Sequence, residues 1–287
     1  MPAPANSLPT PWFDAFEARD WEVNGTRLHA RVPRTPPDGR PALLLLHGFP
    51  QSHVLWHRVV QALQDRFYVV MPDLRGYGDS AKPTGLPDHS NYSKRALAQD
   101  MVALMDALGV AKAHMAGLSM GGMICQYLGA NYPDRVLSLG LCDTASEMPP
   151  RSLWEERFAI ARKDGIAGLV DGTIKRWFVA GFPEKEPAKI AAVREMILAT
   201  PLEGYIGCAS AVRDMAQTTM LLKIKAPTQI MVGREDPACT VDQSTVLLRM
   251  IPHAQMHIID DAAHLSNIEK PEEFNRVLRN FLDRNAG

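Results

Sequence analysis

Cysteines, excess charge and long apolar runs are all scarce in this chain. Its 287 residues include four cysteines, at positions 125, 142, 208 and 239, and none has the C-x-x-C spacing of a metal or redox site. Reduced, buried thiols are therefore expected, and with them a cytoplasmic protein. No apolar run approaches the roughly 20 residues that a membrane span requires, so we expect no membrane-spanning segment.

The net charge is equally small. It is −1 at pH 7, and the sequence has no basic stripe, zinc-finger spacing or glycine-rich phosphate loop. We therefore expect neither a nucleic-acid partner nor a metal ion or other cofactor. The first eleven residues are rich in proline and alanine and lack both the charged and the apolar region of a secretion signal, which predicts a disordered leader. Nothing in the sequence indicates an oligomeric state.

One serine lies between glycines directly after an apolar run. Residues 117–121 have the sequence Gly-Leu-Ser-Met-Gly, and a second glycine follows. The preceding residues 113–118 predict a strand, and residues 120–132 predict a helix. A G-x-S-x-G pattern in that setting is typical of a nucleophile elbow, in which glycines leave room for a tight turn and the hydroxyl stands clear of the backbone. Ser119 is therefore the candidate nucleophile.

A carboxylate and an imidazole follow two later apolar runs. Asp236 comes after residues 228–232, and His264 comes after residues 256–259. A hydroxyl becomes a good nucleophile when an imidazole takes its proton, and a carboxylate fixes the tautomer of that imidazole and stabilises its cation. His264 is the candidate base and Asp236 the candidate acid. Asp143 also follows a predicted strand and precedes His264, so it is the alternative acid.

Backbone N–H groups for an oxyanion are expected from two loops. Residues 42–46 form a fully apolar run, which predicts a buried central strand, and His-Gly-Phe-Pro follows at residues 47–50. Because Pro50 has no N–H, Phe49 is the better donor in this loop. The N–H of Met120, next after the serine, is the expected partner donor. We expect His47 to order the loop through hydrogen bonds.

Together these motifs resemble the α/β-hydrolase superfamily, in which nucleophile, acid and histidine follow one another in the same chain order. The resemblance rests on residues 47–50, 73–80 and 117–121 together with Asp236 and His264, and it extends over nearly the whole chain. It implies an α/β-hydrolase fold, with a mostly parallel sheet flanked by helices, and hydrolysis without a cofactor.

The resemblance also implies a helical cap. From residue 144 to residue 222 the pattern turns helical and rich in aromatic residues, and the alternation of strands and loops resumes afterwards. We expect residues 1–143 and 223–287 to form the core and residues 144–222 to cover the nucleophile at the carboxyl ends of the strands, where ligands bind in such sheets. Trp154 and Trp177 are the candidate pocket walls.

Two families within the superfamily resemble different parts of the chain. The N-terminal part is similar to haloacetate dehalogenases, at residues 47–51, 56–59 and 87–93. The part beyond the serine motif is similar to 3-oxoadipate enol-lactonases. The segments that carry this second similarity are residues 153–157, 176–178, 198–201, 203–205, 213–215 and 264–267.

The nucleophile decides between the two families. The dehalogenase resemblance would imply an attacking aspartate, with arginines one and four positions later that hold the substrate carboxylate. Ser119, Met120 and Met123 occupy those positions here. A serine that displaced a halide would form an ether, which water activated by His264 could not readily cleave. The similarity to dehalogenases therefore concerns the scaffold.

The sequence thus predicts a serine hydrolase that cleaves a small lactone or carboxylic ester through an acyl-enzyme, similar to 3-oxoadipate enol-lactonases. A broad carboxylesterase is the alternative, and a non-catalytic ligand-binding protein on the same scaffold is a more remote one. If the similarity extends to the substrate, an acidic lactone is preferred, because a hydrogen bond to a charged group contributes about 1.5–3 kcal/mol. The candidate partners of its carboxylate are Arg151, Arg157 and Arg213.

Overall fold

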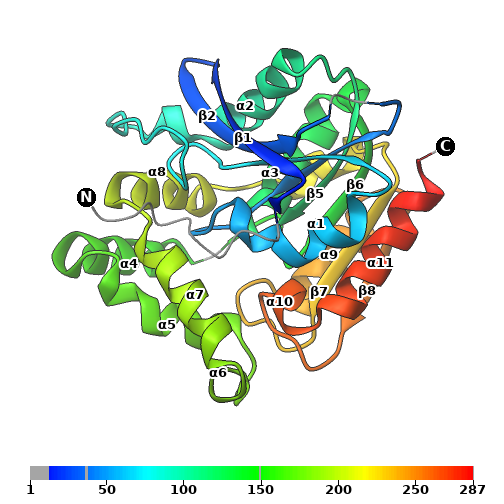
Figure 1. Cartoon of the computed structure of the whole chain (residues 1–287). Coiled ribbons are helices and arrows are strands. Elements are labelled where there is room, and N and C mark those ends of the chain that lie inside the picture. Colours follow the sequence, from blue (N-terminus) through cyan, green and yellow to red (C-terminus); the bar gives the residue numbers. More distant parts are fainter. Residues whose placement is uncertain (1–12, 36–37, 149, 287) are drawn as a thin grey trace.

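A single twisted sheet of eight strands forms the centre of the molecule (Figure 1). The computed structural model describes residues 13–35, 38–148 and 150–286, and the leader predicted at residues 1–11 lies outside them. The strand order is β1-β2-β4-β3-β5-β6-β7-β8. The strands are β1 (Phe16–Val23), β2 (Thr26–Pro33), β3 (Ala42–Leu46), β4 (Tyr68–Pro72), β5 (Ala113–Leu118), β6 (Val136–Cys142), β7 (Thr228–Gly233) and β8 (Ala254–Ile259).

The pairs β1–β2 and β2–β4 are antiparallel, and the other five pairs are parallel. The mostly parallel sheet that the sequence predicted is therefore confirmed. Every residue of β3, β5 and β7 is buried, as expected for parallel strands that are covered on both faces.

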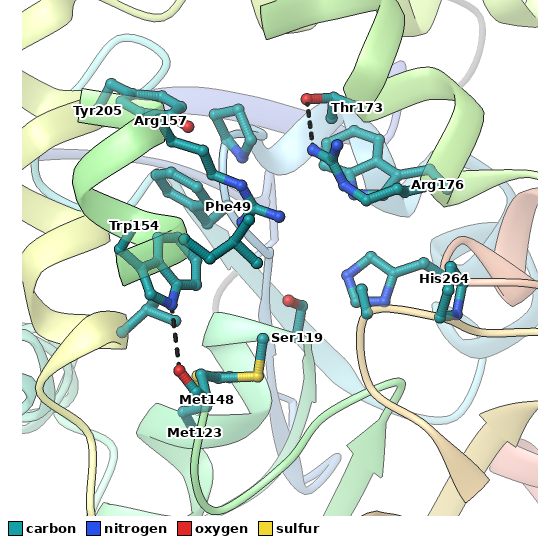
Figure 2. A pocket seen from close by; sticks show the side chains of 16 residues that line it. Phe49, Ser119, Met123, Met148, Trp154, Arg157, Thr173, Arg176, Tyr205 and His264 are labelled. Carbon is teal, nitrogen blue, oxygen red and sulfur yellow. Dashed lines mark hydrogen bonds between the residues drawn. The ribbon is translucent and has the colours of Figure 1, made fainter. Parts of the chain in front are cut away.

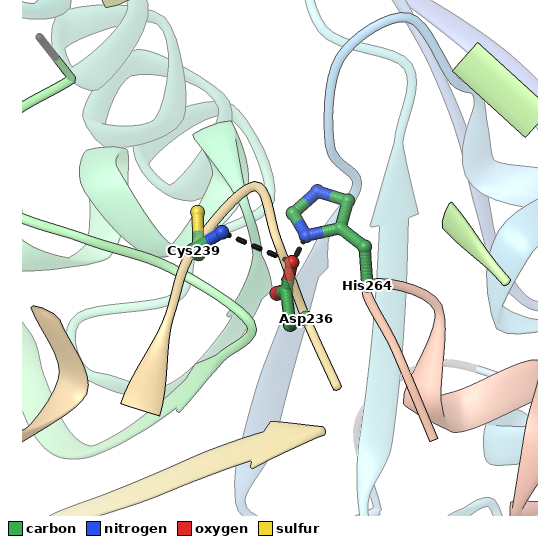
Figure 3. A group of neighbouring side chains, drawn as sticks. All are labelled: Asp236, Cys239 and His264. Atoms are coloured by element: carbon green, nitrogen blue, oxygen red, sulfur yellow. Dashed lines mark hydrogen bonds and ion pairs between the residues drawn. The ribbon is translucent and has the colours of Figure 1, made fainter. Parts of the chain in front are cut away.

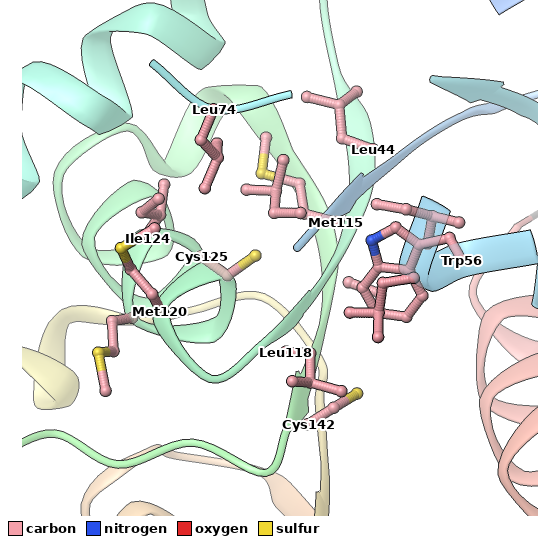
Figure 4. Packing of buried hydrophobic residues seen from close by; sticks show 14 of the residues in the cluster. Leu44, Trp56, Leu74, Met115, Leu118, Met120, Ile124, Cys125 and Cys142 are labelled. Atoms are coloured by element: carbon pink, nitrogen blue, oxygen red, sulfur yellow. The ribbon is translucent and has the colours of Figure 1, made fainter. Parts of the chain in front are cut away.

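Helices cover both faces of the sheet. In Figure 4, Ile124 and Cys125 lie on one side of the strands that carry Leu44 and Met115, and Trp56 lies on the other. Helix α1 packs against α11, and α2 packs against α3. The helices outside residues 144–222 are α1 (His57–Leu63), α2 (Lys94–Ala107), α3 (Met120–Asn131), α9 (Val241–Met250), α10 (Ser266–Glu269) and α11 (Pro271–Arg284), with short 3-10 turns η2 (His53–Trp56), η3 (Ser90–Tyr92) and η4 (Pro133–Arg135). A further 3-10 turn, η5 (Thr218–Lys223), precedes β7.

Between β6 and β7 the chain leaves the sheet and forms a separate group of helices, seen at the lower left of Figure 1. These are α4 (Arg151–Asp164), α5 (Ala167–Trp177), α6 (Phe182–Lys185), α7 (Pro187–Leu198) and α8 (Leu202–Arg213). We call residues 144–222 the cap segment. Its helices pack on one another through apolar faces, for example Trp154 and Phe158 of α4, both buried. Within the described ranges, no helix combines the length and apolarity needed to cross a bilayer.

Candidate active site

Ser119 occupies the turn from β5 to α3. Its backbone φ is +53°, in the left-handed region that a serine rarely adopts and that often marks a functional site. Two glycines make this turn possible. A Cβ on Gly117 would collide with the backbone of Gly121, and a Cβ on Gly121 would collide with the carbonyl of Leu46. The serine side chain is thereby held at the carboxyl ends of the central strands.

His264 and Asp236 are joined by a hydrogen bond, although they come from the loops after β8 and β7. The imidazole Nδ1 donates to Asp236 Oδ2 at 2.8 Å, and both side chains are buried (Figure 3). Asp236 Oδ1 accepts from the N–H groups of Ala238 and Cys239, at 2.8 and 3.0 Å. The carboxylate is therefore fixed by its own loop and fixes the tautomer of the imidazole in turn.

Ser119 and His264 line the same pocket (Figure 2). In the described part of the chain no hydrogen bond joins the Ser119 hydroxyl to the imidazole. Such contacts are often long in a site without substrate and shorten when substrate binds, so the arrangement is compatible with proton transfer from Ser119 to His264.

The alternative acid, Asp143, has different partners. Its Oδ2 accepts from the hydroxyl of Ser266 at 2.6 Å, and its Oδ1 accepts from the N–H of Gly233 at 2.8 Å. Burial, reinforced by the nearby charge of Asp236, raises the pKa of Asp143 well above its usual range. Asp143 therefore connects the ends of β6 and β7 to α10, and Asp236 is the carboxylate that contacts the imidazole.

The surroundings of His264 act on its pKa in opposite directions. Burial lowers the pKa, whereas the charge and hydrogen bond of Asp236 raise it, and the net pKa lies above the ordinary value of 6.5. The positive charge of Arg176 lowers the pKa of His264.

This balance predicts the acid limb of the pH profile. Because only the neutral imidazole can accept the serine proton, kcat/KM on a neutral ester should fall as the pH decreases, with a midpoint above 6.5. Arg176→Gln removes a positive charge and should move the midpoint further up. Measuring kcat/KM from about pH 5 to 9 for both proteins checks this. A wild-type midpoint below 6.5, or a downward shift in the variant, would contradict the assignment of His264 as the base.

The loop that should donate to the oxyanion lies against the nucleophile. A Cβ built on Gly48 would be 3.1 Å from Cβ of Ser119, so the loop that contains Gly48 and Phe49 lies next to the serine. His47 holds this loop, as expected: its Nδ1–H donates to the Gly48 carbonyl at 2.8 Å, and its Nε2 accepts from the N–H of Leu74 at 2.9 Å. Burial lowers the pKa of His47 to about 4, which keeps Nε2 available as an acceptor. Met120 begins α3 directly after Ser119.

The pocket above Ser119 is a cavity of about 170 Å³. Ligand pockets typically measure roughly 300–1,000 Å³, so this one fits a small substrate. Most of its lining residues are apolar or aromatic, and Trp154 and Trp177 are among them. The ring centres of Phe49 and Tyr205 lie 4.7 Å apart, and those of Trp177 and His264 lie 6.1 Å apart. The lining residues include Phe49, Ser119, Met123, Met148, Trp154, Arg157, Thr173, Arg176, Trp177, Tyr205 and His264.

Two guanidinium groups enter the pocket from the cap segment, on the side away from Ser119 (Figure 2). Arg157 of α4 lies 4.7 Å from the centre of the Trp154 ring, and Arg176 of α5 donates to the Thr173 hydroxyl at 3.2 Å. Neither pairs with a carboxylate in the described part of the chain. Burial lowers the pKa of both, and the charge of Arg157 lowers that of Arg176 further. Two half-buried cations without a counter-ion make the pocket attractive to an anion.

The sequence prediction for these arginines was partly wrong. Arg151 and Arg213 do not line the pocket: both contact Asp214, and Arg213 also pairs with Glu155. Of the three predicted arginines only Arg157 lies in the pocket, and Arg176 was missed. A helical pattern could have found it, because Thr173, Arg176 and Trp177 share one face of α5.

Among the residues that the structure describes, two groups of side chains have donor atoms close enough together for a metal ion, within 4.8 Å of one another. In the first, Asp236 and His264 already bond to each other, and burial raises the pKa of the Cys239 thiol well above its ordinary value, which disfavours the thiolate that a metal requires. The second consists of His29, Asp73 and Asp79. There the Asp73 carboxylate accepts from the His53 ring and from the N–H of Asp79. Neither group indicates a metal site.

A mostly parallel sheet with a strained serine at the end of β5, and an Asp–His pair at the ends of β7 and β8, defines a hydrolase of the α/β type. The family model described as "alpha/beta hydrolase fold" matches residues 41–170. Among curated proteins, 3-oxoadipate enol-lactonase 1 of Acinetobacter baylyi is 30% identical over 246 residues, which are 86% of this chain and 90% of that protein. The chain therefore belongs to the α/β-hydrolase family, and it is a hydrolase.

Two further relatives correspond to the two families that the sequence resembles, the dehalogenases and the enol-lactonases. The fluoroacetate dehalogenase of a Burkholderia species is 37% identical over 196 residues, which are 68% of this chain and 57% of that protein. The solved structure of an enol-lactonase from Burkholderia xenovorans LB400 superimposes with a TM-score of 0.88 at 33% identity, covering 92% of this chain and all of that one.

Proposed function

We propose that this protein is a cofactor-independent serine hydrolase that opens a small lactone carrying a carboxylate, through an acyl-enzyme. One observation carries the proposal. Ser119 and His264, which bonds to Asp236, line a small cavity, and two arginines that pair with no carboxylate of the described residues line its other side. The similarity to 3-oxoadipate enol-lactonases supports hydrolysis of an ester or lactone. We also propose that the cap segment, residues 144–222, acts as a lid domain on a core of residues 1–143 and 223–287.

In the proposed reaction, Ser119 attacks the lactone carbonyl while His264 takes the hydroxyl proton. The N–H groups of Phe49 and Met120 donate to the oxygen that becomes negative, and the loss of one such donor typically costs about 3–4 kcal/mol of transition-state stabilisation. Collapse of the tetrahedral intermediate breaks the ring C–O bond, and His264 returns the proton to the leaving oxygen. His264 then activates water, which releases the hydroxy or oxo acid from Ser119.

The two arginines are proposed to bind the carboxylate of the substrate. A guanidinium can donate two parallel N–H bonds to a carboxylate, and such charge-assisted bonds are stronger than neutral ones. Arg157 and Arg176 come from different helices, so a carboxylate between them would be held from two directions, with its lactone ring toward Ser119. Binding of an anion would also relieve the repulsion between the two cations.

The corresponding test compares an acid-bearing lactone with its methyl ester. We expect kcat/KM for the free acid to exceed that for the methyl ester by about 10- to 100-fold, which corresponds to 1.5–3 kcal/mol for a charged hydrogen bond. Arg157→Gln and Arg176→Gln should each reduce this preference about tenfold, because one of the two partners is lost. The matched control is Arg151→Gln, which removes an arginine that is 65% exposed and pairs with Asp214 outside the pocket.

Equal values for the acid and the ester in the wild type, or an unchanged preference in both pocket variants, would refute the carboxylate-binding role. A wild-type preference for the methyl ester would instead favour a broad carboxylesterase. The apolar side chains of Met123, Met148 and Trp154 in the pocket wall favour this second function.

A further inference from the structure

Helix α10 begins two residues after His264, and three of its side chains form hydrogen bonds with other parts of the chain. Ser266 donates to Asp143 at the end of β6, and Asn267 Nδ2 donates to the carbonyl of Leu55 at 3.1 Å. The third residue, Glu269, reaches the cap segment. All three side chains are buried. This short helix therefore holds the histidine loop against several elements at once.

Glu269 accepts a hydrogen bond from each of two segments. Its Oε2 accepts from the N–H of Ala263 at 2.6 Å, one residue before the histidine. Its Oε1 accepts from the N–H of Val179 at 2.8 Å, two residues after the end of α5. A backbone hydrogen bond joins the same two segments, from the N–H of Leu265 to the carbonyl of Trp177 at 3.1 Å. The loop that carries His264 and the end of the helix that carries Arg176 are thus held by one carboxylate.

We propose that Glu269 is a positioning residue that couples the cap to the histidine, so that the pocket arginine and the catalytic base are aligned together. The inference rests on the proposed function, since it assigns His264 as base and Arg176 as a substrate ligand. Without the carboxylate, the end of α5 and the loop before His264 lose their shared acceptor, and the backbone bond from Leu265 to Trp177 holds them together less firmly.

The charge of Glu269 makes this coupling testable. Burial raises the pKa of Glu269 to about 7, the two N–H donors lower it, Glu235 from the loop after β7 raises it, and the neighbouring Lys270 lowers it. At higher pH both oxygens of the ionised side chain accept hydrogen bonds. At lower pH the side chain is neutral, and glutamine then resembles it.

The experiment measures the rate at which a fluorophosphonate probe labels the wild type and Glu269→Gln, from about pH 5.5 to 8.5. We expect the ratio of wild-type to variant rate to be close to one at the acid end and to rise to about tenfold at the alkaline end, because misplacement of a catalytic group by a fraction of an ångström slows reaction strongly. Glu269→Gln should also reduce the preference for the acid-bearing lactone over its methyl ester. Glu272→Gln, an exposed residue of α11, is the control and should stay within about twofold of the wild type.

A ratio that is one at every pH, or constant at a higher value, would overturn the proposal, since a purely structural role gives no pH-dependent ratio. Slower labelling with an unchanged preference would overturn the link to the cap. If the wild type itself did not label, the serine hydrolase function would fail instead. Should Glu269→Gln not fold, Glu269→Asp replaces it, because its shorter side chain cannot reach both N–H groups. Slower labelling together with a reduced preference for the acid-bearing lactone is then expected, and an unchanged rate and preference would overturn the proposal.

Discussion

Ser119→Ala and His264→Ala should each lower kcat on the best substrate by about 10⁴- to 10⁶-fold, because nucleophile and base act as a unit and the loss of either removes most of the catalysis. Steady-state kinetics of the purified variants, with active-site titration to exclude contaminating wild type, measures the effect.

Both variants should remain folded, since each shortens a side chain at the pocket wall and leaves the sheet intact. Circular dichroism and thermal unfolding provide the control. Retention of a tenth of wild-type activity by either folded variant would disprove the assignment. Failure of the wild type to react with a fluorophosphonate would favour a non-catalytic binding protein.

Asp236→Asn should lower kcat by about 10⁴-fold, because an amide in place of the carboxylate favours the wrong tautomer of His264 and cannot stabilise its cation. Asp143→Asn should be much milder in kcat. The carboxylate that contacts the imidazole is that of Asp236, and an amide at position 143 can still accept from the N–H of Gly233.

Comparing kcat for the two asparagine variants on one substrate distinguishes the two acids. A larger loss for Asp143→Asn would transfer the acid role to that residue. Thermal unfolding of both variants separates a loss of stability from a loss of catalysis, because Asp143 also connects the ends of two strands to Ser266.

The parts of the fold that follow local rules were predictable from the sequence. The run at residues 42–46 forms β3 with the predicted bounds, and residues 113–118 form β5 directly before the serine turn. Both are short, mostly apolar runs next to glycine-containing turns, a pattern that predicts a buried strand. The sequence also singled out His264 and Asp236, each after a mostly apolar run, and the structure brings their side chains into contact.

The pocket was less predictable, because its lining depends on how the cap helices face the core. Arg151, Arg157 and Arg213 look alike in the sequence. Only the packing of α4 on α8 turns Arg157 inward and leaves Arg151 and Arg213 next to Asp214. The hydrogen bonds of Glu269 could not be predicted either, since its partner Val179 lies 90 residues away and contributes only a backbone N–H.

The two cap arginines lie within twenty residues of each other in the chain, whereas Ser119, Asp236 and His264 lie outside the cap segment altogether. If the proposed roles hold, recognition and bond cleavage are encoded in separate stretches of the gene. Under the proposed function, substitutions in this one short insertion would change which acid is preferred, whereas the kind of bond that is cleaved is set by the nucleophile in the core.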